Sequence, residues 1–328
     1  MTAIHARPRV SVVVPAKDQA AFVDDALGSL ARQLDDLHDL EVVVVDDGST
    51  DGTGELVAQH DARLPVLRLL RNETPVGPAS ARNQGLAEVH GRFVAFLDPD
   101  DWFAPRHLQH LADALETLDV DFVRTDHVRH EGGRRTVRRV PEHRRGTPLD
   151  PRSGIGPADR TTPVDYCFPP FGLYDARLLE DGLLTFPSGR FTAEDRPWIW
   201  DLHLHARSYA VVDSVGAFYR RGVPTSLTQV RDPRQLDFLP CYDLVLAMIR
   251  EDREPETLWP KAVQQLLAIA CHHLERSPES YRPDVVAGIA KTLANAPDDV
   301  VQAVVGQLDT RRRDLLADVP GLMLRSAS

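Results

Sequence analysis

Residues 92–102 read RFVAFLDPDDW, an apolar strand that stops at a group of acidic residues. Three further apolar runs precede it, and residues with helical spacing separate the runs. Strands are expected at 10–14, 41–45, 66–70 and 92–97, and helices at 20–34, 50–60 and 79–89. Continuous apolar strands that alternate with helices indicate a mostly parallel sheet covered on both faces. The sequence therefore predicts an α/β fold, with a Rossmann-like sheet flanked by helices.

The rest of the chain is less regular and then becomes helical. A β-hairpin is expected over 121–140, a long mobile loop over 144–170 and a strand over 210–219. From about residue 236 the pattern is entirely helical and is interrupted by prolines. Helices are expected at 236–250, 260–274, 284–293 and 298–316. We therefore divide the chain into a first domain, 1–232, and an appended helical domain, 233–328.

Composition argues against several classes of protein. The chain carries a formal net charge of −11, whereas nucleic acid requires clustered cations, so we expect no nucleic-acid partner. Cys167, Cys241 and Cys271 lie far apart, which argues against disulfides and a structural zinc site and favours the cytoplasm. The run at 10–14 is too short for a signal peptide. We expect no transmembrane segment, and peripheral contact with a membrane stays open.

The acidic residues after the strand at 92–97 indicate a divalent cation. Asp98 and Asp100 are two residues apart, so in an extended chain they project to the same side. Such carboxylates repel one another unless a cation lies between them, and Mg²⁺ is usually held by one or two carboxylates with phosphate oxygens and water. We therefore predict a Mn²⁺ or Mg²⁺ site at this pair. The alternative is a turn in which Asp100 or Asp101 caps a helix over 102–118.

Two other segments carry polar residues that suit a nucleotide. Residues 45–53 read VDDGSTDGT, where an acid at the strand end could accept hydrogen bonds from a base or a ribose. Residues 76–86 read VGPASARNQGL, where small residues open a helix whose N-terminus could face a phosphate. Arg82 on that helix could reach a pyrophosphate or a neighbouring acid. A capped turn and a surface arginine are the alternatives.

In this order and spacing, the segments closely resemble the nucleotide-binding half of family 2 glycosyltransferases. The resemblance covers roughly residues 9–230 and implies the A-type glycosyltransferase fold. It implies a nucleotide-binding half at 9–118 and an acceptor-binding half at 119–232. The residues that it implies for the nucleotide sugar are Pro15, Lys17, Asp18, Asp47, Arg82 and Asp98, with Asp98 and Asp100 binding the metal.

Two later segments also look like parts of this family. Residues 192–198 read TAEDRPW, and the resemblance assigns Asp195 as the general base for the acceptor hydroxyl. Glu194 would orient Asp195 or contact the acceptor, and a helix N-cap is the alternative. Residues 218–228 read FYRRGVPTSLT and resemble the loop that closes over the diphosphate, so Arg220 or Arg221 is expected to pair with phosphate oxygens.

The resemblance predicts an inverting, metal-dependent glycosyltransferase. It would move a sugar from a nucleoside-diphosphate donor, a UDP-sugar, to a hydroxyl of a glycan, cell-surface polymer or small natural product. A nucleotidyltransferase and a non-catalytic nucleotide-sugar-binding protein of the same fold stay open. Eight arginines between 124 and 145 are expected to be mostly solvated, and an anionic acceptor is the sharper hypothesis. An apolar stripe at 266–274 is expected in the core, with a homo-oligomer through the C-terminal helices as the alternative.

Overall fold

The computed structural model describes residues 7–223, 232–276 and 278–323, and its first part is a four-stranded parallel sheet. The bounds are β1 Val10–Ala16, α1 Val23–Leu30, β2 Leu40–Asp46, α2 Thr53–Ala58, β3 Leu67–Arg71, α3 Pro78–Leu86 and β4 Phe93–Phe96. The strands lie in the order β3-β2-β1-β4. Every residue of β1 and β2 is buried, because their valines pack against neighbours on both faces of the sheet.

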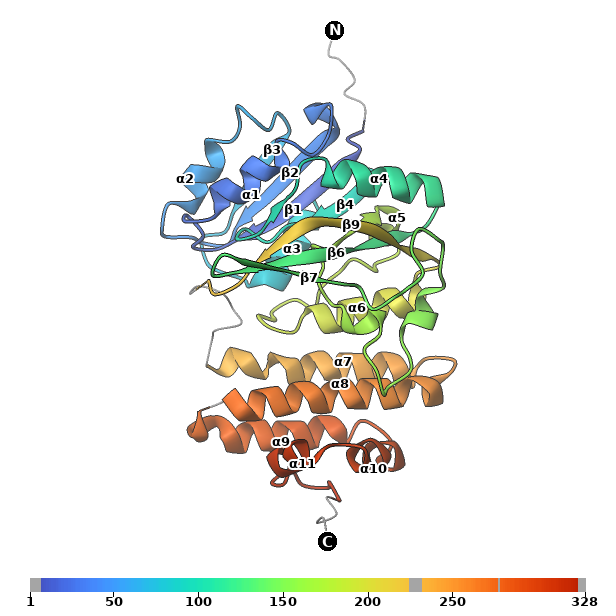
Figure 1. Ribbon diagram of the computed structural model, residues 1–328. Helices are drawn as coiled ribbons and strands as arrows, with labels where there is room; N and C mark the ends of the chain where they lie inside the picture. Colours follow the sequence, from blue (N-terminus) through green and yellow to red (C-terminus); the bar gives the residue numbers. More distant parts are fainter. Residues whose placement is uncertain (1–6, 224–231, 277, 324–328) are drawn as a thin grey trace.

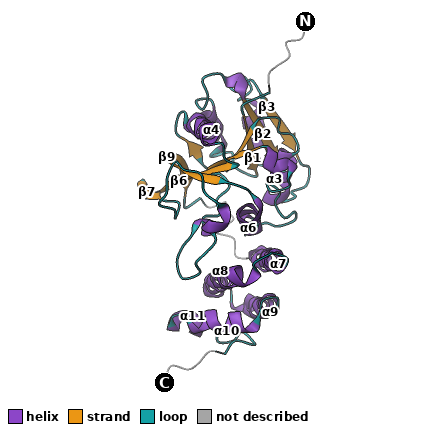
Figure 2. Cartoon of the chain, turned by 90° about the vertical axis from the view of Figure 1, so that its right-hand side faces the viewer, coloured by secondary structure: helices purple, strands orange, loops and turns teal. Residues whose placement is uncertain are grey.

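The sheet continues through strands in which parallel and antiparallel pairings mix. The bounds are β5 Trp102–Phe103, α4 His107–Leu118, β6 Phe122–Glu131, β7 Arg134–Arg138, β8 Gly172–Asp175, α5 Arg177–Glu180, α6 Asp195–His205 and β9 Tyr209–Arg220. The order from β4 onward is β8-β6-β9-β5, and β7 pairs with β6 as the predicted hairpin. Figure 2 shows α3 and α4 on opposite faces of the sheet. The predicted α/β class is confirmed.

Strand β1 runs further than its valine run predicts, through Pro15 to Ala16. The carbonyl oxygen of Val13 accepts a hydrogen bond from Leu97 N on the β4 side, whereas that of Ala16 accepts one from Asp47 N on the β2 side. Consecutive residues of a strand bond to alternate sides, so the missing N–H of Pro15 faces the β4 side. Pairing with β4 has already ended there. Proline therefore costs this strand no hydrogen bond.

The helix expected over 102–118 begins only at His107. Trp102 and Phe103 form β5 instead, which pairs antiparallel with β9. Phe103 is buried, and its N–H donates to the hydroxyl of Ser29 on α1 at 3.1 Å. The aromatic residues after the acidic group thus extend the sheet, through pairing with a strand more than a hundred residues away that local spacing does not reveal.

The end of the segment 144–170 is packed, since residues 162–170 are mostly buried, so the expectation of a mobile loop is wrong for that part. The segment holds two short 3-10 helices, Pro151–Gly154 and Pro163–Asp165. Tyr166 and Cys167 are buried. Proline- and glycine-rich composition excludes regular structure here, but it does not exclude packing.

The last part of the described chain is helical. The bounds are α7 Phe238–Arg250, α8 Pro255–Arg276, α9 Arg282–Leu293, α10 Asp298–Gly306 and α11 Thr310–Leu315. Figure 1 shows α6, then α7 and α8, then α9 to α11 in successive layers away from the sheet. Four residues of the predicted stripe, Leu266, Leu267, Ala270 and Leu274, are buried in the same hydrophobic cluster as the sheet. In the described ranges, no helix is long and apolar enough to cross a bilayer. The division at residue 232 stays a prediction.

Candidate active site

A cavity of about 1130 Å³ opens where β1, β2 and β4 end. Parallel strands bring their carboxyl ends to one edge of a sheet, so residues far apart in sequence meet there. The predicted site residues that line the cavity are Pro15, Lys17, Asp18, Asp47, Arg82, Asp98, Asp100, Glu194 and Asp195. The cavity thus brings together the acids after β4 and the acid pair of α6.

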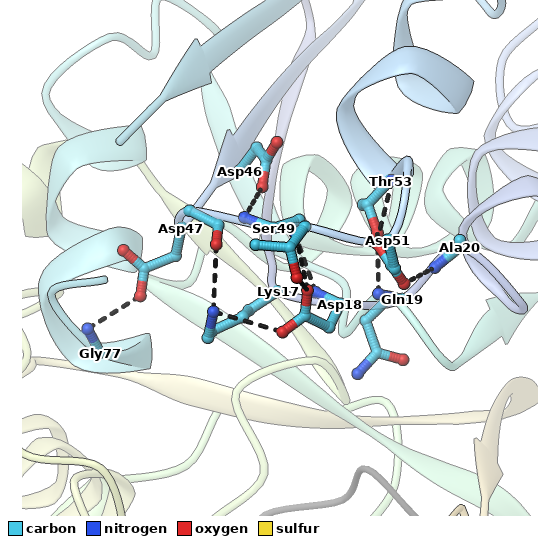
Figure 3. A network of polar contacts seen from close by, with 12 residues as sticks. Lys17, Asp18, Gln19, Ala20, Asp46, Asp47, Ser49, Asp51, Thr53 and Gly77 are labelled. Atoms are coloured by element: carbon cyan, nitrogen blue, oxygen red, sulfur yellow. Dashed lines mark hydrogen bonds and ion pairs between the residues drawn. The ribbon is translucent and has the colours of Figure 1, made fainter. Parts of the chain in front are cut away.

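Figure 3 shows that the loops after β1 and β2 hold each other. Asp18 N donates to Ser49 Oγ at 2.9 Å, and Asp18 Oδ1 accepts from Thr50 N at 2.8 Å. Lys17 Nζ donates to the carbonyl oxygen of Gly48 at 3.1 Å and lies 3.3 Å from Asp18 Oδ2. Lys17 and Asp18 therefore fix the rim of the cavity, and their contact with a nucleotide stays a prediction.

Asp51 joins the same two loops at a second point. Its Oδ2 accepts from Ala20 N at 2.9 Å, and its Oδ1 accepts from Thr53 Oγ1 at 2.5 Å (Figure 3). The Thr53 hydroxyl in turn accepts from Gln19 N at 2.8 Å. The sequence indicated Asp51 only as a cap of the next helix, because its partners on the other loop lie about thirty residues away.

Asp47 positions the start of α3. Its Oδ1 accepts from Asn72 Nδ2 and from Val76 N, both at 2.8 Å, and its Oδ2 accepts from Gly77 N at 2.9 Å. Gly77 has φ of +88°, and a Cβ there would lie 3.2 Å from the Phe191 ring. Asp47 therefore holds the turn that begins α3, and its contact with a base or ribose stays a prediction.

Arg82 connects the two groups of acids. Its Nη1 donates to Glu194 Oε1 at 2.5 Å, and its Nη2 donates to Asp98 Oδ1 at 3.1 Å. Burial alone would lower the pKa of Arg82, but the negative charges of Asp98 and Glu194 outweigh it and raise the pKa. Arg82 is therefore no surface arginine: it is 7% exposed and compensates two carboxylates.

Asp100 and Asp101 lie beside Asp98 in a region of unbalanced negative charge. Burial, and then the charge of Asp98, raises the pKa of Asp100 to about 6. Burial, followed by the charges of Asp100 and Asp98, raises the pKa of Asp101 well above its usual value. Asp101 is 1% exposed and accepts from Arg220 N at 2.7 Å, so it anchors the end of β9 and does not cap a helix.

The side chains of Asp98 and Asp100 fit a divalent cation. Both line the cavity. Burial raises the pKa of Asp100 most, and the charge of Asp98 adds a further rise that a cation between the two carboxylates would relieve. In the part of the chain that the structure describes, no group of three or more His, Cys, Asp or Glu side chains is placed to hold a metal. A metal at this pair would complete its coordination with phosphate oxygens and water, as Mg²⁺ usually does.

The acid pair lies at the N-terminal end of α6. Asp195 is the first residue of the helix, and its Oδ1 lies 3.9 Å from Arg196 Nε. Burial raises the pKa of Asp195, and the charge of Arg196 opposes this rise. Ala193, just before the pair, has φ of 58°, a left-handed conformation that costs a non-glycine residue roughly 1–2 kcal/mol. Such strain beside a cavity is typical of functional sites.

The two predicted phosphate-binding arginines do not line the cavity. Arg220 Nε donates to the carbonyl oxygen of Asp100 at 2.8 Å, and its Nη2 pairs with Asp25 at 2.9 Å. Arg221 Nη1 donates to the hydroxyl of Tyr219 at 3.2 Å. Residues 224–228 of the predicted closing loop lie outside the described residues. A contact between either arginine and a diphosphate stays a prediction.

The sequence did not reveal the far wall of the cavity. Aromatic residues from the segment before β8 and from β9 line it, together with one side of α8. The members of this wall include Phe168, Phe171, Tyr219, Gln264, Gln265, Ile269 and His272. Lys261 Nζ and Gln265 Nε2 both donate to Asp165, at 2.6 Å each, which ties α8 to the segment that carries the aromatic residues.

Comparisons with known proteins identify the family and the fold of the chain. The model of the family described as Glycosyl transferase family 2 matches residues 11–183. The uncharacterized glycosyltransferase EpsJ of Bacillus subtilis (strain 168) is 29% identical over 228 residues, which is 68% of this chain and 64% of EpsJ. The chain thus spans less than two thirds of that relative's length.

Two solved structures share the fold. That of Staphylococcus aureus TarS 1–349 in complex with UDP has a TM-score of 0.75 at 22% identity, covering 94% of this chain and 87% of that chain. The structure of the mannosyltransferase PcManGT from Pyrobaculum calidifontis, in complex with GDP-Man and Mn²⁺, has a TM-score of 0.53 at 21% identity. The match covers 97% of this chain and 86% of that chain. By sequence, TarS of S. aureus (strain Mu50 / ATCC 700699), a poly(ribitol-phosphate) beta-N-acetylglucosaminyltransferase, is 28% identical over 213 residues, 64% of this chain and 35% of TarS.

Proposed function

The chain belongs to glycosyl transferase family 2, and from this premise we propose that it is an inverting glycosyltransferase. It transfers a sugar from a UDP-sugar to a hydroxyl of a glycan, cell-surface polymer or small natural product. One observation carries the proposal: the acids after β4 and the acid pair of α6 line a single cavity, and Arg82 bonds to both groups.

The donor lies against the ends of β1, β2 and β4. Pro15, Lys17 and Asp47 form the wall for the base and ribose, and the cavity-lining start of α3 faces the phosphates. The fold that the chain shares with TarS, whose structure contains UDP, supports this placement. The interlocked loops after β1 and β2 support it further, since a pre-formed wall reduces the entropy lost on binding.

Asp98 and Asp100 hold the metal, Mn²⁺ or Mg²⁺. When bound, the metal supplies positive charge that neutralises the leaving diphosphate. Arg82 holds Asp98 through a hydrogen bond from its Nη2 to Asp98 Oδ1 at 3.1 Å. The structure of the fold relative PcManGT contains Mn²⁺, which supports the proposal of a divalent cation.

Asp195 is the general base. The acceptor oxygen bonds to the anomeric carbon on the face opposite the diphosphate, the bond from that carbon to the diphosphate oxygen breaks, and Asp195 takes the hydroxyl proton. Inversion needs only this one base. Glu194 cannot serve as a second base while Arg82 holds it at 2.5 Å, so it positions Asp195 and the N-terminal end of α6.

The test is a calorimetric titration of nucleotide sugars with and without Mn²⁺, followed by an assay of UDP release. We expect one UDP-sugar to bind in a Mn²⁺-dependent manner and to release UDP slowly to water and faster with acceptor. Absence of binding by every nucleotide sugar would overturn the proposal. So would release of pyrophosphate from a nucleoside triphosphate and a sugar phosphate, which is the reaction of a nucleotidyltransferase, or binding without any release of UDP.

A further inference from the structure

The arginines of the β6–β7 hairpin divide between its two faces. Residues that pair across strands project to the same face of a sheet. His127 pairs with Arg138, and Arg129 pairs with Thr136. On the other side of β6, Arg129 pairs with Tyr219 of β9. Glu131 pairs with Arg134 in the same register. Arg129, Glu131, Arg134, Thr136 and Arg138 therefore share one face with Tyr219, and we call these five residues the cavity face of the hairpin.

The cavity face continues the aromatic wall of the active site. The His127 ring stacks on Phe171, with centroids 4.1 Å apart, and lies edge-on to Tyr219 at 6.1 Å. Phe171 and Tyr219 both line the cavity. Arg138 is paired with His127 across the strands, so its side chain projects on the same face as the His127 ring. A chain that leaves the cavity past Tyr219 would pass over Arg129 and then reach β7.

The opposite face has no such connection. Arg135 lies over the Phe218 ring at 5.6 Å, and Phe218 stacks on Trp102 at 5.1 Å. Trp102 also contacts His130, at 5.6 Å between centroids. Neither Trp102 nor Phe218 lines the cavity, so an arginine on this face serves as a matched control for one on the cavity face.

Two guanidinium groups on the cavity face have no carboxylate partner within the described ranges. Arg134 and Arg138 are exposed and take part in no ion pair there, whereas Arg129 pairs with Glu131 at 2.6 Å. These two exposed guanidinium groups, on the face that continues into the aromatic wall, form a positive surface beside the cavity. Guanidinium groups bind phosphate and carboxylate groups well in such positions.

We infer that the cavity face binds an acceptor chain that carries repeated anionic groups, phosphate or carboxylate. The inference rests on the proposed function and names the class of acceptor. A repeating anion suits two charges four residues apart on one face of a strand, with the uncharged Thr136 between them on that face. An anionic membrane is the less favoured partner, because a bilayer would contact the exposed Arg135 on the opposite face as readily as Arg138.

The test uses fluorescent polyphosphate and polygalacturonate, a phosphate and a carboxylate chain, with neutral dextran as the comparison. Binding to the full-length protein is followed by anisotropy over a range of salt concentrations. We expect Arg134→Gln and Arg138→Gln each to weaken the binding of at least one polyanion by about 2- to 5-fold and to reduce its salt dependence. Arg135→Gln removes the same charge from the opposite face and should leave binding unchanged.

Several outcomes would overturn the inference. Equal weakening by Arg135→Gln would indicate non-specific attraction, and binding of phosphatidylserine vesicles in preference to both polyanions would indicate a membrane. Dextran binding as tightly as the polyanions would exclude a role for charge. UDP binding, measured in parallel, is expected to be the same in all variants. If the wild-type protein did not bind UDP, the proposed function would fail. The binding of polyanions and its dependence on Arg134 and Arg138 are measured separately, so the two failures can be told apart.

Discussion

Arg82 Nη1 donates to Glu194 Oε1 at 2.5 Å, although 112 residues separate the two in the chain. The same guanidinium donates to Asp98 from Nη2. One buried cation therefore joins the nucleotide-binding acids to the acid pair of α6. Since both carboxylates depend on it for charge compensation, the geometry of the two groups is coupled.

Arg82→Met should destabilise the protein by about 3–5 kcal/mol, because it leaves buried carboxylates without a partner. Adding Glu194→Gln should recover part of this loss. The matched control is Arg92→Met, which removes the exposed pair between Arg92 and Glu116 and should cost at most about 1 kcal/mol. Chemical denaturation measures the free energy of unfolding of all three variants. An equal cost for Arg82→Met and Arg92→Met would contradict the assigned compensation.

Asp195→Asn should abolish transfer while leaving the donor bound. We expect a loss of about 10²- to 10⁴-fold in kcat, because the amide cannot take the acceptor proton, and unchanged affinity for UDP. Asp201→Asn, on the same helix and outside the cavity lining, is the control and should retain activity. Transfer by Asp195→Asn at the wild-type rate would remove Asp195 as the base.

Metal-dependent donor binding should weaken as the pH falls below about 6. The pKa of Asp100 is raised to about 6, so below this value a proton competes with the metal for the carboxylate. Titration of UDP with Mn²⁺ across this range measures the effect. Asp100→Ala should bind UDP weakly at every pH, whereas Asp61→Ala, at an exposed site outside the cavity, should behave as wild type. Wild-type affinity in Asp100→Ala would exclude Asp100 as a ligand.

The ion pair between Arg152 and Asp252 should make stability depend on pH in the acid range. Hydrogen bonds from Arg152, at 2.7 and 2.8 Å, lower the pKa of Asp252 to about 2 from its ordinary 3.8. The ion pair stabilises the protein fully at pH values above 3.8, the ordinary pKa of the carboxyl, and this stabilisation is lost as the pH falls toward 2. Asp252→Asn should therefore cost about 1–2 kcal/mol at neutral pH and little near pH 2. Urea denaturation measures the free energy of unfolding of the wild type and of Asp252→Asn at both pH values. An equal difference between the two proteins at neutral pH and near pH 2 would contradict this prediction.

The sequence alone determined the parallel half of the sheet and the place of the acids on it. Valine runs such as Val42–Val45 can be buried on both faces only in a covered parallel sheet, and that burial is a property of local composition. Because parallel strands end at one edge, the positions of Asp47, Asp98 and Asp100 after strand ends sufficed to predict a shared site. The acid pair at 194–195 was recognised from its motif.

Only the tertiary structure decided which partner each side chain has. Distant segments are joined by the bond from Arg82 to Glu194 and by the aromatic strand where a helix was expected. They are also joined by the packing of 162–170 and by the part of the cavity wall that α8 forms. The strand register decided which face of the hairpin carries Arg138 and which carries Arg135. Local spacing fixes how residues alternate along one element, but the neighbour across a strand or a cavity depends on how whole elements cross and pair, which no short stretch of sequence encodes.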